Sequence, residues 1–571
     1  MRDLRLATWF VWVGTVVVGS AGGCSASGTS SPYSSGNTGG SAGDSGTVNP
    51  GGSGGSDSDG SIVIDGSAGS GGSEIIPDPT DCAQAALGHT YLGCDFWPTV
   101  TDNIVSPEFD FAVVVANPGS TDAQIQVTGG ALTAPTTATA PANSLTKIYL
   151  PWVGALKSLS WIEGQPDNGC PTWVKTSTVS APGGAYHLTS SIPVAVYQFN
   201  AIEYAAKGGP SGKDWNAYCT THTCLGQLKN KCFSFTNDAS LLLPSTALTG
   251  NYRIAGSSPW RDDSDPQSTF TYPAYFAVTG TQNNTSVTVH VSSTGAVSAG
   301  GGVPATPAGG TASFNLNAGD VVMVVGTDTA DFSGTFVQAT APVQVITGIA
   351  CSQMPHGTEA CDHLEESVLP IETLGKHYFV TVPTGPLGAP VQHVVRLYGN
   401  VDNTQLTYPG ANPGLPSVIN AGEMIELAGV SQDFEIIGDH ELTVASFQYG
   451  QGPVSSASKG DPSQSFMTTV EQYRLKYVFL SPDDYDLSFA DVVQPLDAKL
   501  TLDGVPVTQP PVPISSGFGV TRIQLGPGNA GTHVLESDKP VGLQVLGYGD
   551  WTSYQYPGGL NLGRIAPVPP K

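Results

Sequence analysis

The chain is poor in charge, and most of the charge it has is negative. Only 12% of its 571 residues are Asp, Glu, Lys or Arg, against roughly 25% in an ordinary globular domain. Acidic residues number 47 and basic residues 21, which gives a net charge of −26. A nucleic-acid-binding protein needs a basic surface to neutralise phosphates. The composition therefore excludes nucleic acid as a partner.

Helical periodicity and catalytic motifs are also missing. The sequence contains no His-Glu-x-x-His, no phosphate-binding Walker loop and no Gly-x-Ser-x-Gly on a strand-to-helix turn. We therefore expect no enzyme, no catalytic residue, no cofactor and no metal. Structural calcium would need a ligand loop that the acidic turn at Asp262, Asp263 and Asp265 does not have.

The first 24 residues have the pattern of a secretion signal. Arg2 and Arg5 precede an uncharged apolar run from Leu6 to Gly19, which is shorter than the roughly 20 residues of a membrane-spanning helix. The small residues before Cys24 resemble a bacterial lipobox. We expect acylation of Cys24, which would place a lipoprotein at the outer membrane or cell surface of a bacterium. The membrane would then be a partner through this lipid. The alternative is ordinary cleavage and a soluble secreted protein.

A segment rich in small residues follows the signal. Between residues 25 and 73, 30 of 49 positions are Gly or Ser. Such a segment cannot bury enough apolar surface to offset the entropy lost on ordering. We expect a disordered tether over residues 25–75.

Eight cysteines remain after Cys24, and none of them lies beyond residue 361. An even number in an exported chain predicts disulfides. The candidates are Cys82, Cys94, Cys170, Cys219, Cys224, Cys232, Cys351 and Cys361. The spacing favours the local pairs Cys82–Cys94 and Cys351–Cys361 and leaves three pairings open for the other four. A zinc site at Cys351, His356, Cys361 and His363 is the less favoured alternative, because the spacing fits no common zinc finger.

The rest of the chain is predicted to be all-β, and it contains a four-fold repeat. Short β-branched and aromatic runs alternate with Gly, Pro, Asn and Asp turns. One recurring element, predicted as a hairpin, has Pro193, Pro342, Glu441 and Pro540 at matching places, 149, 99 and 99 residues apart. Opening hairpins recur at 111–127, 275–289, 394–407 and, more weakly, 487–502.

We interpret each repeat as one antiparallel β-sandwich-like module. The expected modules are 80–235, which contains a Cys-rich insert, then 236–362, 363–464 and 465–571. A β-propeller is the alternative, and it would require the last repeat to close on the first.

One stretch carries a family resemblance. Residues 360–380 read Ala-Cys-Asp-His-Leu-Glu-Glu-Ser-Val-Leu-Pro-Ile-Glu-Thr-Leu-Gly-Lys-His-Tyr-Phe-Val. This segment resembles the IgGFc-binding protein N-terminal domain family, and the likeness extends over most of residues 90–550. The matching motif residues are Cys361, Asp362, His363, Leu364, Glu365, Pro370 and Gly375. The chain departs from the family in two places. Leu374 stands where the family commonly has an aromatic residue, and the chain has only one of the two prolines that the family motif contains.

The resemblance implies a binding scaffold, although a shared fold does not carry a shared ligand. We expect an exported, lipid-anchored surface protein that acts in adhesion or binds an extracellular protein or glycan. An enzyme acting on extracellular polysaccharide and a purely structural envelope component are the alternatives. Several tryptophans near loops would supply a contact surface if exposed, but such residues more often pack in cores.

Overall fold

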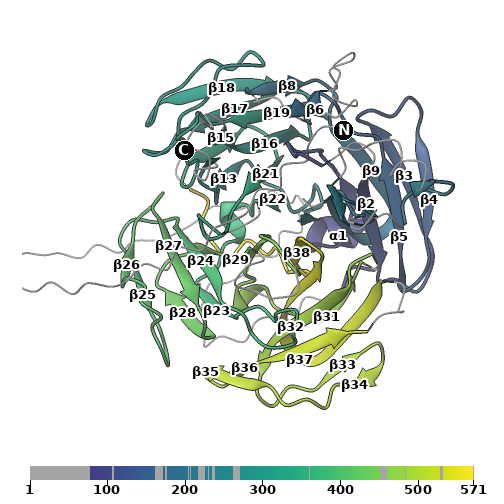
Figure 1. The fold of residues 1–571 in the computed structure, drawn as a ribbon, viewed down its shortest axis with the longest axis vertical. Helices are drawn as coiled ribbons and strands as arrows, with labels where there is room; N and C mark the ends of the chain where they lie inside the picture. Colours follow the sequence, from purple (N-terminus) through teal and green to yellow (C-terminus); the bar gives the residue numbers. More distant parts are fainter. Residues whose placement is uncertain are drawn as a thin grey trace, which may run out of the picture. The chain divides into compact units, whose positions relative to one another are not determined.

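The repeating unit is an antiparallel sandwich of seven strands in module 1 and eight in each later module, and it occurs four times (Figure 1). The computed structural model describes residues 78–569, except 106–108, 158, 161–171, 174–176, 204, 206–207, 216–225, 229–230, 235–237, 262–270, 359–360, 451–458, 483 and 527–530. The predicted Cys24 lipid site and the tether lie outside the described residues. The prediction of an all-β fold is confirmed.

The strands of the four modules follow one order. Module 1 contains β1 (Gly93–Phe96), β2 (Phe111–Asn117), β3 (Ala123–Gly129), β4 (Thr136–Ala140), β5 (Ser144–Leu150), β9 (Tyr186–Asn200) and β12 (Ala239–Leu242). Module 2 contains β13 (Asn251–Arg253), β16 (Ala274–Gly280), β17 (Thr285–His290), β18 (Thr311–Leu316), β19 (Val321–Val325), β20 (Phe336–Ala339), β21 (Val343–Ser352) and β22 (Asp362–Ser367).

The later modules repeat this order. Module 3 contains β23 (His377–Val380), β24 (His393–Gly399), β25 (Thr404–Thr407), β26 (Val418–Ile419), β27 (Met424–Val430), β28 (Phe434–Gly438), β29 (Leu442–Gln448) and β30 (Gln464–Phe466). Module 4 contains β31 (Arg474–Leu480), β32 (Leu487–Pro495), β33 (Leu500–Leu502), β34 (Val505–Pro506), β35 (Val512–Ser515), β36 (Phe518–Leu525), β37 (Thr532–Gly549) and β38 (Thr552–Pro557).

Short elements decorate these modules. Helix α1 (Cys82–Gly88) precedes β1, and two 3₁₀ turns, η1 (Ile371–Thr373) and η2 (Val470–Gln472), lie in the connectors. Small hairpins form from β6 (Leu159–Ser160) and β7 (Thr172–Trp173), from β10 (Gly226–Leu228) and β11 (Lys231–Phe233), and from β14 (Trp260–Arg261) and β15 (Thr271–Tyr272). Strand β8 (Val179–Ala181), from the long insert of module 1, pairs with β19 and so extends a sheet of module 2.

The element predicted as a hairpin is a strand that passes from one sheet to the other. The first half of β9 pairs with β1 and β3, and its second half pairs with β2 and β12. Strand β37 does the same, whereas the chain breaks near Pro342 and Glu441 into β20–β21 and β28–β29. The hairpin prediction is therefore wrong. Two apolar runs separated by a polar or Pro position are compatible with a crossing strand as well as with a turn. A Pro at the crossing lacks one backbone hydrogen bond of the sheet, and the strand does not need that bond where it passes between sheets.

A tyrosine hydroxyl secures this crossing in three of the four modules. Tyr252 and Tyr378 each donate to a carbonyl at the crossing, those of Val343 and Leu442, at 2.6 Å. Tyr477 donates to the carbonyl of Val541. The three acceptors are 99 residues apart, so the repeat holds at the level of single hydrogen bonds. Module 1 has Phe96 at this register, three residues after the partner of Val194.

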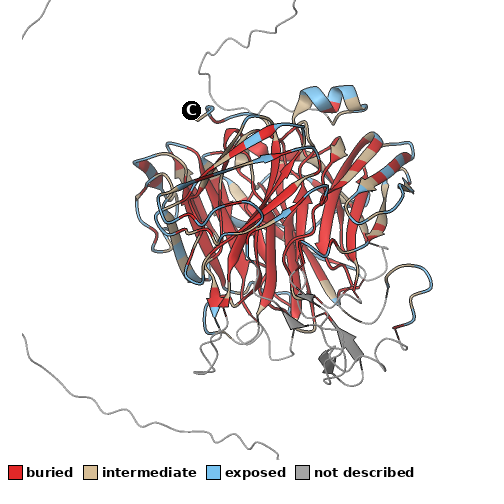
Figure 2. Ribbon diagram, turned by 90° about the horizontal axis from the view of Figure 1, so that it is seen from above, coloured by how far each residue is buried: buried red, intermediate tan, exposed pale blue. Residues whose placement is uncertain are grey.

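The four modules form a ring. The last strand of each module, β12, β22, β30 or β38, lies next to the ring axis, and each packs on its two neighbours (Figure 1). Sheet pairing joins each of these strands to the strands that precede it in the chain. These strands are buried throughout (Figure 2).

The last module closes on the first. One apolar core joins Tyr197 and Phe199 of module 1 to Tyr477, Leu543 and Tyr556 of module 4. Backbone hydrogen bonds from Tyr91 N to Leu560 O (3.2 Å) and from Leu562 N to His89 O (2.7 Å) complete the seam. The four modules are thus sandwiches, as predicted, and they form a closed ring, as the propeller alternative requires.

Candidate functional site

The family-motif strand β22 lies at the centre of the ring. Asp362, His363 and Glu365 are all fully buried, and Leu364 packs in a core shared by modules 2, 3 and 4. Beyond the strand, Pro370 and Leu374 are buried in the connector to module 3. Gly375 lies against Thr469 so closely that any side chain there would clash. The motif therefore builds the interior of the ring.

Asp238 ties three of the axial strands together. Its carboxyl group accepts the backbone N–H of Ala239 at 2.9 Å, of Glu365 at 3.1 Å and of Gln464 at 3.3 Å. These three donors belong to β12, β22 and β30. Burial raises the pKa of Asp238, while the backbone donors lower it. The group therefore hydrogen-bonds to one axial strand from each of modules 1, 2 and 3.

Glu365 reaches from module 2 into module 1. Its carboxylate accepts hydrogen bonds from Thr101 Oγ1 and Asn200 Nδ2, both at 2.7 Å, and from Gln198 Nε2 at 3.3 Å. His363 Nε2 lies 3.6 Å from the same carboxylate. A buried charge is tolerated when it is paired and hydrogen-bonded in this way. This network makes the contact between modules 1 and 2 strongly polar.

Further carboxyl groups occupy the axis beside β22. Thr552 Oγ1 donates to Asp362 Oδ2 at 3.3 Å, and Asp461 lies close enough to raise the pKa of Asp362 beyond the rise that burial causes. Burial also raises the pKa of Asp461 and Glu366. These groups are 2% exposed or less. They are therefore closed off from a polymeric substrate, and among the described residues no group of three or more His, Cys, Asp or Glu could hold a metal ion.

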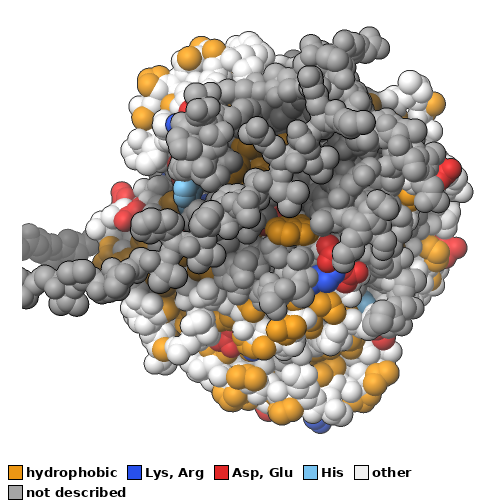
Figure 3. Space-filling view, in the orientation of Figure 1, with side chains coloured by type: hydrophobic (Ala, Val, Ile, Leu, Met, Phe, Trp, Pro, Cys, Tyr) orange, Lys and Arg blue, Asp and Glu red, His pale blue; other side chains and the backbone are white. Residues whose placement is uncertain are grey.

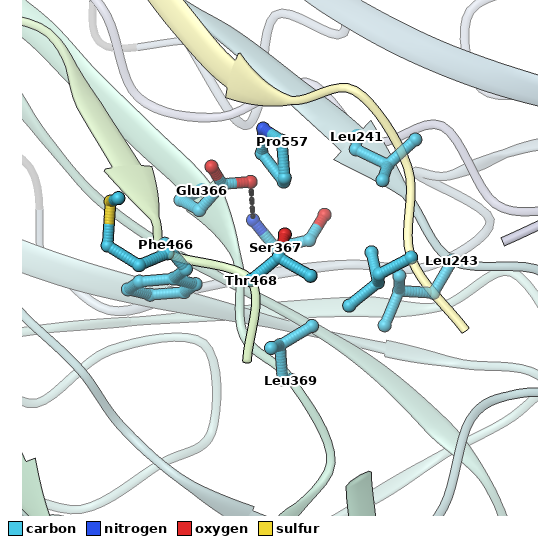
Figure 4. A pocket seen from close by; sticks show the side chains of 10 residues that line it. Leu241, Leu243, Glu366, Ser367, Leu369, Phe466, Thr468 and Pro557 are labelled. Carbon is cyan, nitrogen blue, oxygen red and sulfur yellow. Dashed lines mark hydrogen bonds between the residues drawn. The ribbon is translucent and has the colours of Figure 1, made fainter. Parts of the chain in front are cut away.

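A small pocket opens at the end of the axial strands (Figure 4). All four modules contribute to its lining of Leu241, Leu243, Glu366, Ser367, Leu369, Phe466, Met467, Thr468, Pro557 and Leu560. In Figure 4 the Glu366 carboxyl group accepts the N–H of Ser367, at 3.0 Å. Its cavity volume of about 10 Å³ is no more than a single water molecule needs. The axis is thus packed rather than open.

The cysteines form the two local disulfides that the spacing favoured. Cys82 is joined to Cys94 and Cys351 to Cys361. The second bond rules out the zinc alternative, because neither sulfur remains a thiolate ligand. The other four candidates, Cys170, Cys219, Cys224 and Cys232, lie outside the residues whose side chains the structure describes.

The tryptophans of the described region pack inward more than they face solvent. Trp97, Trp215 and Trp260 are between 7% and 8% exposed. Trp97 stacks on His187 with ring centroids 4.2 Å apart. The acidic turn at Asp484 is also buried, whereas Asp486 forms an ion pair with Lys459. The tryptophan contact surface considered from the sequence is therefore wrong for these three residues, and Asp262, Asp263 and Asp265 lie outside the described residues.

An exposed apolar rim lies on module 4, which we define as Leu496, Val505 and Val512 with the segment 505–513 between the latter two. These side chains are 43%, 66% and 52% exposed and are three of the seven large hydrophobic residues exposed in the described region. The segment Val-Pro-Val-Thr-Gln-Pro-Pro-Val-Pro contains no charge. Figure 3 shows hydrophobic side chains gathered over this part of the molecule. Sequence reasoning missed this rim, although the uncharged Pro/Val run signals it.

Comparisons with known proteins point to one family. A family model described as IgGFc binding protein matches residues 238–547, which is more than half of the chain and runs from β12 to β37. The human IgGFc-binding protein is 26% identical over 245 residues. That match covers 42% of this chain and 4% of the human protein, so the chain spans only a small part of its relative.

Solved structures add no argument about the fold. An anti-sigma factor domain-containing protein from Clostridium clariflavum is 10% identical with a TM-score of 0.11, covering 78% of this chain and 99% of that one. A GH78 family rhamnosidase of Bacillus sp. GL1 is 9% identical with a TM-score of 0.11, covering 82% and 55%. Among the described residues, no helix is long and apolar enough to cross a membrane.

Proposed function

The chain belongs to the IgGFc-binding protein family, and from that premise we propose that it is a non-enzymatic scaffold that binds an extracellular protein. The observation that carries the proposal is the family match over residues 238–547 together with the burial of the motif strand. Residues buried on the axis cannot touch a partner, so the family's shared residues build the ring. Partner recognition then falls to the outer surface.

We assign that recognition to the apolar rim of module 4. Exposed apolar patches on a soluble protein mark sites of protein contact. Segment 505–513 carries no charge on a chain of net charge −26, so a protein partner that docks there meets no like charge from the segment itself. Leu496 and Val512 both lie against Gly519, so these two residues form one surface, whereas Val505 lies on β34 at the other end of the same sheet.

Binding measurements on the full chain test this assignment. Arrays of extracellular proteins, immunoglobulin Fc and glycans are probed with the wild type and with the Val505→Asp/Val512→Asp variant. We expect a protein ligand, and a loss of affinity on the order of tenfold or more in the variant. Leu387→Asp is the matched control, because Leu387 is 81% exposed but lies in module 3. Equal loss in both variants contradicts the assignment to the rim, and binding to glycans alone contradicts the proposal of a protein partner.

We further propose that Cys24 carries the lipid that holds the scaffold at a bacterial outer membrane or cell surface. Supporting this are the signal pattern of residues 1–24 and the Gly/Ser-rich residues 25–75, which would project the modules outward. The expected result is that the wild type partitions into detergent and the Cys24→Ser variant into the aqueous phase. A polysaccharide-acting enzyme would instead shorten its polymer, and a structural envelope component would self-associate without a ligand.

A further inference from the structure

A lysine and an aspartate meet at a partly buried site of module 1, away from the axis and the rim. Asp110 immediately precedes β2, and Lys213 lies on the loop that follows β9. Lys213 Nζ donates to Asp110 Oδ2 in direct contact. The lysine side chain is 8% exposed and the aspartate side chain 27% exposed.

A second carboxyl group stands beside this pair. Glu203 is fully buried, and its Oε1 lies 3.8 Å from Lys213 Nζ. Its Oε2 accepts the backbone N–H of Asp110 at 3.2 Å, so Glu203 lies beside the lysine and the backbone of the aspartate. Burial raises the pKa of Glu203 to about 8, against the attraction of Lys213 that lowers it. Glu203 can therefore hold or release a proton near neutral pH.

A small aromatic and apolar core lies beside the lysine. Trp215 packs on Phe109 with ring centroids 5.0 Å apart, and Lys213 Nζ lies 4.2 Å from the centre of the Trp215 ring. Val105 and Ala201 complete this small core. Trp215 Nε1 donates to Gly208 O at 3.0 Å, which holds the loop in place. Because the Lys213 side chain is only 8% exposed, its charge is largely withdrawn from water, which makes the ion pair costly to keep.

We propose that Lys213 and Asp110 condense into an intramolecular amide, with Glu203 transferring the protons. Glu203 donates its proton to the Asp110 carboxylate and takes one from the Lys213 ammonium group. The free amine then attacks Asp110 Cγ, so that a C–N bond forms. A Cγ–O bond breaks, and the oxygen leaves as water with one proton from the carboxyl group and one from the amine.

The reaction balances without an oxidant, a reductant or a cofactor, and Glu203 ends as it began. Contact between the amine and the carboxyl group supplies the proximity that makes such a condensation feasible. The product replaces a buried ion pair by a neutral group, which removes the cost of burying two charges. It would join the edge of β2 covalently to the loop after β9.

Other lysine–carboxylate pairs of the described region lack this setting. In the Lys539–Asp497 pair the side chains are 40% and 75% exposed, and in the Lys476–Glu536 pair 31% and 51%. Lys459 contacts two carboxylates, Asp486 and Asp550, each 38% exposed. Lys539–Asp497 therefore serves as an internal control with the same two reacting groups and an open environment.

The experiment is peptide mapping by mass spectrometry on the full chain, after reduction, denaturation and digestion. We expect one linked species that contains residues 110 and 213 and is lighter than the two separate peptides by one water. Lys213→Arg keeps the positive charge and should abolish the link. Glu203→Gln should abolish it too, with near-ultraviolet circular dichroism showing that the variant is folded.

Three results would overturn the proposal. The first is a folded wild type with separate, unmodified peptides at both positions. The second is a link at Lys539–Asp497 as abundant as the link at Lys213–Asp110, which would show that partial burial of the site does not promote the condensation. The third is a mass lower by one ammonia that maps to Lys157 and Asn103, which are also in direct contact, with Lys213 left free. A complete link in Glu203→Gln would overturn the role given to Glu203.

Discussion

Module 1 and the three modules after it reach one fold with different side chains. The family match begins at residue 238, so it covers modules 2 to 4 and only the last strand of module 1. Module 1 nevertheless has the same strand order, the same crossing strand and the same place on the axis. It replaces the crossing tyrosine by Phe96 and joins module 2 through the Glu365 network. The pattern of buried and exposed positions, rather than particular residues, is thus what preserves the sandwich.

The largest expected effect breaks the link between module 1 and the rest. Glu365→Ala removes the buried carboxylate that accepts hydrogen bonds from Thr101, Gln198 and Asn200. We expect a loss of about 3–5 kcal/mol in the free energy of unfolding. Calorimetry should show module 1 melting apart from the later modules. Glu426→Ala, which removes a 40% exposed partner of Arg396, is the control, and an equal loss there would contradict the role of Glu365.

The contact between modules 3 and 4 also depends on a buried carboxyl group, but with a pH response. Asp491 accepts from Thr384 N at 3.0 Å and from Thr384 Oγ1 at 2.6 Å. Burial raises the pKa of Asp491 to about 6. Between pH ~4 and pH ~6 the unfolded chain therefore releases a proton that the folded chain keeps, so stability falls as pH rises through this window.

The size of that fall follows from the shift of about two pH units, which corresponds to about 3 kcal/mol. Asp491→Asn should flatten the stability profile between pH ~4 and pH ~6 in urea titrations. Asp497→Asn, at a 75% exposed site, should leave the profile unchanged. An unaltered slope in Asp491→Asn would show that the carboxyl group is not responsible.

Reduction should separate the first two modules from the last two. The disulfides Cys82–Cys94 and Cys351–Cys361 lie in or before modules 1 and 2, and no cysteine follows residue 361. Each closes a short loop, so we expect a loss of about 2–3 kcal/mol per bond. Hydrogen exchange under reducing conditions should rise near β1 and β22 and stay unchanged in β24 and β32. Uniform exchange through all four modules would contradict this expectation.

The smallest effect concerns the tyrosine that module 1 lacks. Tyr378→Phe and Tyr477→Phe each leave a buried carbonyl at the crossing without its donor, and we expect a cost of about 1–2 kcal/mol each. Urea denaturation of these variants would measure it. Tyr408→Phe is the comparison, because its hydroxyl bonds the Pro416 carbonyl at an exposed place. If all three variants lose the same stability, the crossing hydroxyl has no special role.

The repeat and the local disulfides were open to sequence reasoning because each depends on residues close together in the chain. Segments 111–127 and 275–289 each form two strands, β2–β3 and β16–β17, but the hairpin prediction is wrong for both, because the two strands of each segment do not pair with each other. The interior of the site could not be predicted from the sequence, because Asp238 accepts the backbone N–H groups of Glu365 and Gln464, which are more than a hundred residues away in the chain. Closure of the ring could not be predicted for the same reason: His89 and Leu562 hydrogen-bond to each other although they are separated by almost the whole described chain. The strand that crosses between the sheets was wrongly predicted as a hairpin, because the same local sequence pattern fits both a crossing strand and a hairpin.

The closed seam also sets a limit on how such a chain can grow. In an open solenoid a new repeat is added at an end, where it meets a free interface. Here the interface of module 4 is already occupied by module 1 through Tyr91, Leu560 and the shared core. A fifth module would have no partner without reopening the ring and changing every angle between neighbours. Four is therefore a number set by geometry, and variation between relatives should appear as inserts within modules rather than as added modules.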